Sequence, residues 1–195
     1  MIGKGKSISH GVAALEYDLA KEINGQAVAT EIARHELYGC TGAEMVQEMK
    51  PYHIDFPNVK NNCLRFEVSP SIEESATFTD ADWAELGNDF MQRMGLANHQ
   101  YIIIRHSGTE SKKEQAHLHI LANRVSLSGE LYRDNWIGKK ATEAANAIAK
   151  ERNFVQSQDI GKVNKAEIKE AMDGVLKKMQ GFDFTKFKEE LVREV

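Results

Sequence analysis

Residues 101–125, YIIIRHSGTESKKEQAHLHILANRV, contain two aliphatic runs separated by a polar loop. His106 ends the first run, and His117 and His119 open the second. Side chains along a strand alternate between two faces, so His117 and His119 project to the same side. If the two runs pair as a hairpin, His106 lies beside them. Three imidazoles on a sheet leave coordination positions open, as a catalytic metal requires, so the stretch predicts a metal site.

The alternative is that each histidine is an ordinary surface or core residue with no role in metal binding. The composition does not decide between the two interpretations, but it bounds the class of protein. A chain of 195 residues with 28% charged and 8% aromatic residues is long enough for one globular domain with a core and an appendage. The two cysteines, Cys40 and Cys63, have no ligand spacing, which favours a reducing cytoplasm and excludes a disulfide scaffold.

Neither a membrane helix nor a signal peptide is visible in the sequence, so we expect a cytoplasmic protein without a membrane partner. The net charge of −4 argues against nucleic-acid binding only until its distribution is considered. Residues 66–92 contain seven acidic side chains and no Lys or Arg, whereas residues 99–152 contain nine Lys or Arg and six Asp or Glu. The acidity therefore lies away from the histidines, and DNA binding stays open.

Hydrophobic periodicity and capping signals predict alternating helices and strands along the chain. The expected strands are 2–6, 62–69, the hairpin 101–106 and 116–125, and a short 130–133. The expected helices begin near Ser9, occupy two short stretches within 24–50, and then cover 79–95 and 137–152, with two more starting at Asn164 and Thr185. Capping-box spacing at Thr41 and a cap at Thr79 mark two of these helix starts.

Tyr17 is the candidate nucleophile for a metal that polarises a phosphodiester. The first helix has a buried stripe predicted from spacings of three and four: Val12, Leu15, Leu19 and Ile23. At 100° per residue Tyr17 falls on the opposite side, where its hydroxyl is accessible. A phenol must be activated by the metal or by a base before it attacks. The alternative is a surface tyrosine that packs on a neighbouring loop.

Two polar side chains on the predicted strands have open roles. Glu67 is a candidate acceptor for an imidazole N–H, which would fix the tautomer of that histidine, or it forms a salt bridge with Arg65. Asn123 lies on the face of His117 and His119 by period two. It orients a ligand, contacts DNA, or forms hydrogen bonds within the sheet.

The chain resembles the relaxases, the mobilisation nucleases of conjugative and mobilisable elements (MobA/VirD2-like). The resemblance spans nearly the whole chain. It rests on the tyrosine segment ALEYDL, the strand RFEVSP, and the histidine motif IIIRHSGTESKKEQAHLHILANRV. The later SLSGELYRDNW, which precedes an alanine-rich helix, and the terminal FDFTKFKEELVREV are also similar to this family.

The resemblance implies an α+β fold of the HUH endonuclease group, with a mostly antiparallel central sheet, flanking helices and C-terminal helices. It implies that Tyr17 attacks one phosphodiester of single-stranded DNA at an origin of transfer and forms a 5′-phosphotyrosyl link. From the residues alone, His10 or Glu67 is a candidate to assist this attack. His106, His117 and His119 would hold a divalent metal, Mg²⁺ or Mn²⁺. Accessory mobilisation proteins and the coupling protein of a secretion system would be partners. We expect residues 1–155 to form the catalytic domain and 156–195 a helical extension cut from a longer protein.

Two departures from the family affect the site. The loop between His106 and His117 is polar, with Thr109 where many relatives carry an acidic residue, and the segment around Arg65 and Glu67 matches the family only loosely. Separately, Tyr38 is a second tyrosine near the N-terminus and offers a fallback nucleophile. Phosphate contacts are expected from basic residues around and after the hairpin, together with Asn123. These basic residues are Lys112, Lys113, Arg124, Arg133, Lys139 and Lys140.

Three other functions compete with the relaxase. A replication-initiator nickase usually carries its tyrosine on a helix after the histidine motif, and residues 137–152 contain none. A non-catalytic DNA-binding or metal-binding module of the same fold would not depend on Tyr17. A metal hydrolase that acts through water would cleave DNA without covalent attachment.

Overall fold

The histidine hairpin lies in the middle of a five-stranded antiparallel sheet. The computed structural model describes residues 1–108, 115–179 and 181–194. For residues 160, 193 and 194 it describes the backbone only. Across the sheet the strands follow in the order β1 (Ile2–Ile8), β5 (Cys63–Ser69), β7 (His117–Ser126), β6 (His99–His106) and β4 (Ala29–His35).

The register of these strands brings the polar side chains of the site into line. In the β6–β7 pair, His106 lies opposite His117 and Ile104 lies opposite His119. On the other side of β7, Glu67 lies opposite His119, and in the next pair Lys4 lies opposite Glu67. The hairpin predicted from the sequence is therefore confirmed, and its histidines face one side of the sheet.

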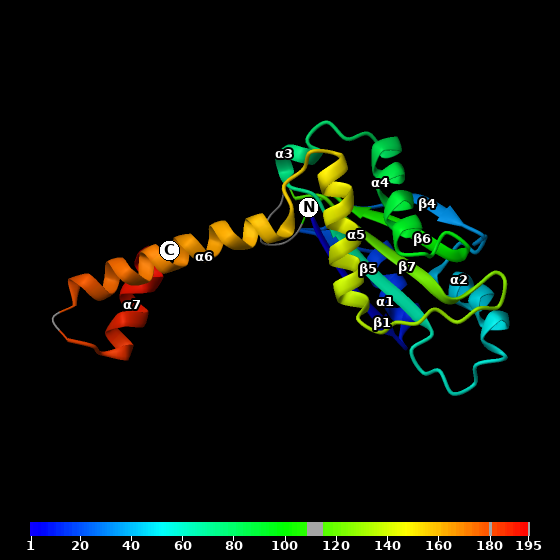
Figure 1. Cartoon of the computed structure of the whole chain (residues 1–195). Helices are drawn as coiled ribbons and strands as arrows, with labels where there is room; N and C mark the ends of the chain where they lie inside the picture. The colour runs from blue at the N-terminus through cyan, green and yellow to red at the C-terminus, as the bar shows by residue number, and fades with distance from the viewer. Residues whose placement is uncertain (109–114, 180, 195) are drawn as a thin grey trace. The chain divides into compact units, whose positions relative to one another are not determined.

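Helices cover both faces of the sheet (Figure 1). One face packs against α4 (Asp80–Arg93) and α5 (Ile137–Glu151), through a core that includes Phe66, Ile103 and Ile120. The other face packs against α1 (Gly11–Leu19) and α2 (Gly42–Met49), through a smaller core that includes Ile102 and Leu121. The expected α+β fold is confirmed.

Residues 22–35 form strands, where the sequence predicted helix. The first helix ends at Leu19 and is followed by the two-residue strands β2 (Glu22–Ile23) and β3 (Gln26–Ala27). Asn24 and Gly25 turn between them with φ of 54° and 75°, as an Asn-Gly hairpin requires. The next segment, β4, has little apolar alternation of its own and is a strand because β6 offers it an edge to pair with.

The remaining short elements lie at the ends of strands and helices. They are the 3₁₀ helix η1 (Lys50–His53) and the single-turn α3 (Ile72–Ser75). The expected strand at 130–133 is reduced to one bridge between Val125 and Leu131. The helices α2 and α4 begin at Thr41 and Thr79, whose side chains form the predicted capping boxes.

The chain divides into two compact units, Met1–Phe154 and Val155–Val195. The second unit contains α6 (Ser157–Lys178) and α7 (Phe184–Glu194), which contact each other. Helix α6 begins before Asn164, so the predicted cap at that residue is an interior position of a longer helix. Among the described residues, none of the helices is both long and apolar enough to cross a membrane.

Candidate active site

The three histidines of the hairpin converge at the start of β7. The exposed fractions of His106, His117 and His119 are 2%, 7% and 9%, and their ligand nitrogens all lie within 4.8 Å of one another. The Nε2 atoms of His117 and His119 are 3.1 Å apart. Metal–nitrogen bonds of about 2.0–2.1 Å would span these separations after small side-chain shifts, so the group fits a divalent ion.

Burial favours the neutral forms of His106 and His119. Desolvation lowers the pKa of His106, and desolvation together with the nearby His106 and Arg65 lowers the pKa of His119 to about 2. A neutral imidazole has a lone pair to give to a metal, whereas a protonated imidazole has none. The chemistry of the donors is therefore that of a metal site at neutral pH.

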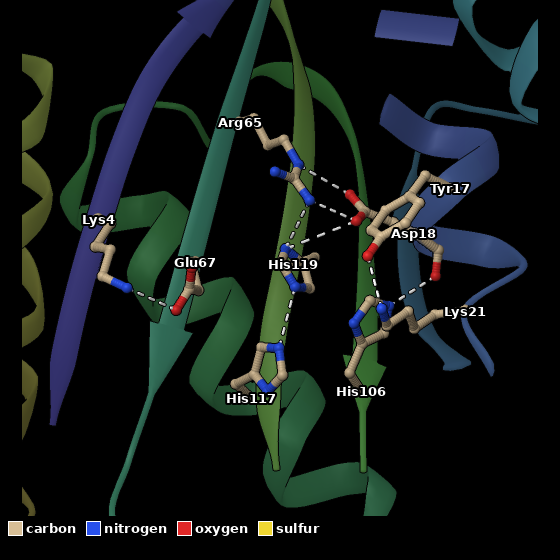
Figure 2. A network of polar contacts seen from close by, with 9 residues as sticks. All are labelled: Lys4, Tyr17, Asp18, Lys21, Arg65, Glu67, His106, His117 and His119. Atoms are coloured by element: carbon tan, nitrogen blue, oxygen red, sulfur yellow. Dashed lines mark hydrogen bonds and ion pairs between the residues drawn. The ribbon is translucent and has the colours of Figure 1, made fainter. Parts of the chain in front are cut away.

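Tyr17 lies on α1, on the same side of the sheet as the histidines (Figure 2). Its side chain is 56% exposed, and its hydroxyl oxygen accepts a hydrogen bond from Lys21 Nζ at 2.6 Å. The same ammonium nitrogen is 4.8 Å from the centre of the phenol ring. The accessible hydroxyl expected from the helical spacing is present, although Val12 of the predicted stripe is also 39% exposed.

Asp18 and Arg65 form an ion pair next to the histidines that the sequence did not predict. Arg65 donates from Nε at 3.0 Å and from Nη2 at 2.5 Å to the two carboxylate oxygens of Asp18, whose exposed fraction is only 2%. The sequence held one signal for it. Asp18 falls near Leu15 on the helical wheel, so a carboxylate lies on the buried side of α1 and needs a partner.

Glu67 accepts a hydrogen bond from Lys4 Nζ at 3.0 Å (Figure 2). Arg65, the alternative ionic partner considered for it, is bound to Asp18 instead. Glu67 nevertheless lies opposite His119, and both residues line an open pocket on this face of the sheet. Basic side chains complete the lining of this pocket: Lys4, Lys6 and Arg65.

Asn123, for which a DNA contact was one of the predicted roles, has a buried side chain that is hydrogen-bonded inside the fold. Its side chain is fully buried, donates to Gln100 Oε1 at 2.9 Å, and lies 2.6 Å from His53 Nε2. Of the roles considered for Asn123, the hydrogen bond inside the fold is the one that the structure contains. A buried amide in the middle of a sheet must be paired internally, and this requirement overrides its position on the histidine face.

Arg124 is also committed to the fold. Its guanidinium donates to the carbonyls of Asn61 and Tyr132 and to the carboxylate of Asp134 at 2.7 Å. All three partners lie in the segments that flank the far end of β7. Arg124 therefore fastens two loops together, and the predicted phosphate contact is not supported by its position.

The other basic candidates have different surroundings. Arg133 and Lys139 are exposed, whereas Lys140 donates to the carbonyl of Arg133 and lies 5.0 Å from the ring of Tyr132. These residues follow the end of β7 opposite to the histidines. Lys112, Lys113 and Thr109 lie outside the described residues.

An antiparallel sheet with clustered histidines beside a tyrosine-bearing helix is the class of site that the relaxase resemblance implied. A family model, the MobA/VirD2-like nuclease domain of relaxases, matches residues 17–154, which is most of the chain. The chain belongs to this family.

Two solved structures are similar to the chain. One is described as the conjugative relaxase TrwC in complex with oriT DNA, metal-bound structure; it has a TM-score of 0.47 and 11% identity, and the match covers 99% of this chain and 90% of that one. The metal-free structure of the same complex matches with the same TM-score and coverage and 10% identity. No curated protein matches the chain.

Proposed function

We propose that this protein is a relaxase that nicks and rejoins one DNA strand at an origin of transfer. The observation that carries the proposal is the pairing of an exposed tyrosine with a buried histidine cluster on one side of the sheet (Figure 2). Membership of the relaxase nuclease family is consistent with this chemistry.

Nicking is a transesterification. The Tyr17 oxygen attacks the phosphorus atom and loses its proton, and the bond from phosphorus to the 3′ oxygen breaks. The phosphate then remains on Tyr17 as a 5′-phosphotyrosyl ester, and the departing oxygen takes up a proton to become a free 3′-hydroxyl. The reverse reaction rejoins the strand. Lys21 lies 2.6 Å from the phenolic oxygen, where its ammonium stabilises negative charge that develops during attack.

His106, His117 and His119 would hold Mg²⁺ or Mn²⁺, whose positive charge would offset the negative charge of the scissile phosphate. The protein side chains do the rest. The burial of His106 and His119 favours their neutral forms, and Glu67 would assist from β5, where it lies opposite His119.

The DNA would be single-stranded, since a phosphodiester must fit between Tyr17 and the histidines. The open pocket beside His119 offers Lys4 and Lys6 for contacts to flanking phosphates. Arg133, Lys139, Lys140, Lys112 and Lys113 are proposed to contact more distant phosphates. Accessory mobilisation proteins and a coupling protein would deliver the nicked strand, and the reaction would take place in the cytoplasm.

Covalent capture tests the proposal. The protein is incubated with Mn²⁺ or Mg²⁺ and single-stranded oligonucleotides that span the origin, and the products are separated on a denaturing gel. We expect a protein–DNA band that is absent in Tyr17→Phe and unchanged in Tyr38→Phe. Tyr38 is a matched control because it is 76% exposed and hydrogen-bonded to Glu36.

Each alternative function predicts a different pattern of bands on the gel. Cleavage that persists in Tyr17→Phe without a covalent band would mean hydrolysis through water. DNA binding with no cleavage by the wild-type protein under any metal would indicate a non-catalytic module. His117→Ala and His119→Ala should retain DNA binding and lose the covalent band, and chelation of the metal should have the same effect on the wild type.

A further inference from the structure

Asp18 touches two of the three clustered histidines, and it directly follows the candidate nucleophile in the chain. We propose that Asp18 is a positioning residue that orients His106 and His119 for metal binding and links them to the nucleophile helix. This inference rests on the proposed function for its catalytic consequence, but its effect on metal affinity can be measured separately.

The first contact is made by the main chain. His106 Nε2 lies 2.7 Å from the carbonyl oxygen of Asp18. A carbonyl only accepts, so the imidazole proton is on Nε2 and the lone pair is on Nδ1. In Figure 2 this second nitrogen of His106 points toward His119. The carbonyl is available because Asp18 lies in the last turn of α1, where carbonyls have no partner within the helix.

The second contact is made by the carboxylate. His119 Nδ1 lies 3.2 Å from Arg65 Nη2 and 3.8 Å from Asp18 Oδ1. For His119 to give the lone pair of Nε2 to a metal, its Nδ1 must carry the proton and donate it. A guanidinium has no acceptor, so Arg65 does not fill that role. The Asp18 carboxylate can accept this hydrogen bond after it moves slightly closer to the ring.

Arg65 holds the carboxylate in this place. Its two hydrogen bonds to Asp18 fix the orientation of a side chain that is almost completely buried. The negative charge of Asp18 also offsets the positive charge of the Arg65 guanidinium. Without Asp18, this guanidinium would repel a divalent cation bound to His119. Without the carboxylate, the site would contain a cation beside a ligand and no acceptor for the ligand's N–H.

The consequence is a mechanical link between nucleophile and metal ligands. The peptide unit between Tyr17 and Asp18 joins the attacking group to a residue that binds two imidazoles. The last turn of α1 is therefore held against β6 and β7 by the same contacts that orient the ligands. Glu67 is not part of this network, because it accepts its hydrogen bond from Lys4.

Metal affinity tests the inference without any DNA. Mn²⁺ binding to the full chain is measured by calorimetry and electron paramagnetic resonance for the wild type, Asp18→Asn and Asp134→Asn. Loss of an outer partner of a ligand typically lowers metal affinity about 10–100-fold, and we expect this for Asp18→Asn. Asp134→Asn is the matched control, since it breaks the same kind of ion pair, with Arg124, at the far end of β7. It should bind Mn²⁺ as the wild type does.

A folded Asp18→Asn protein with wild-type Mn²⁺ affinity would overturn the proposal. If that variant does not fold, ¹⁵N NMR of the wild-type imidazoles decides. We expect His106 to be protonated on Nε2, and His119 to be protonated on Nδ1 once Mg²⁺ or Zn²⁺ is added; the opposite tautomer at either ring overturns the proposal. If Mn²⁺ affinity falls in Asp18→Asn but the wild-type protein forms no covalent band with DNA, only the nicking function is rejected.

Discussion

At the scale of single residues, the site combines side chains that local geometry positions with an ion pair, Asp18 and Arg65, that tertiary packing brings together. The alternation of a strand placed His117 and His119 on one face, and helical spacing left Tyr17 accessible; both features are local and were predicted. The partnership of Asp18 with Arg65 spans 47 residues and depends on how α1 packs on the sheet. No local pattern encodes that packing, so the network around the histidines became visible only in the folded chain.

Lys21 is the residue for which the structure makes a separate functional prediction. Replacing it by methionine removes the ammonium that donates to the Tyr17 oxygen at 2.6 Å. We expect the rate of covalent-adduct formation to fall about tenfold, which corresponds to about 1.4 kcal/mol of transition-state stabilisation. Lys21→Arg should restore part of the rate, because a guanidinium also donates.

The measurement is a single-turnover time course of the protein–DNA band. Lys150→Met is a suitable control, since Lys150 is an exposed lysine of α5, which packs on the other face of the sheet. Mn²⁺ affinity should not change in Lys21→Met. An unchanged rate in that variant would show that the contact with the phenol has no role in attack.

At the scale of elements, the sequence predicted the pieces with their own strong signals. The β6–β7 hairpin, β5 and the capped helices α2 and α4 were found where periodicity and capping boxes placed them. Strand β4 was missed because its exposed and half-buried residues alternate weakly, and its pairing with β6 provides the hydrogen bonds that define it. Long-range pairing overrode local propensity at this edge of the sheet.

The contact between β1 and α5 gives a prediction at this scale. A methyl group on Gly3 would lie 2.5 Å from the carbonyl oxygen of Ala141 and 2.6 Å from the Cβ of Ala145, so the strand and helix approach more closely than any side chain permits. Gly3→Ala should therefore lower the free energy of unfolding by about 1–3 kcal/mol, as overpacking does.

Gly138→Ala is the matched control on the same contact. A Cβ there meets nothing closer than the Gly5 carbonyl oxygen at 3.5 Å, which is an ordinary contact. Because alanine favours helix over glycine, this variant should be as stable as the wild type or more stable. Urea denaturation followed by circular dichroism gives both values. Equal midpoints for Gly3→Ala and the wild type would show that α5 moves aside without cost.

At the scale of the whole molecule, the chain consists of two compact units with a boundary after Phe154. The family match ends at the same residue. The sheet, both layers of helices around it, Tyr17 and the three histidines all belong to the first unit. The second unit has two helices and several exposed apolar side chains, among them Val163 and Ile168.

A chain of residues 1–154 should therefore fold alone and keep the chemistry. We expect its thermal midpoint to lie within about 2 °C of the full chain, a shift that corresponds to about 0.5–1 kcal/mol in a domain of this length. It should also bind Mn²⁺ and form the covalent band at the same rate. Residues 155–195 alone should be largely unfolded, because about 40 residues bury too little apolar surface for independent stability. A truncated chain that aggregates or loses its cooperative transition would show that the second unit stabilises the first, and a stable truncated chain without the covalent band would assign the second unit a part in engaging DNA.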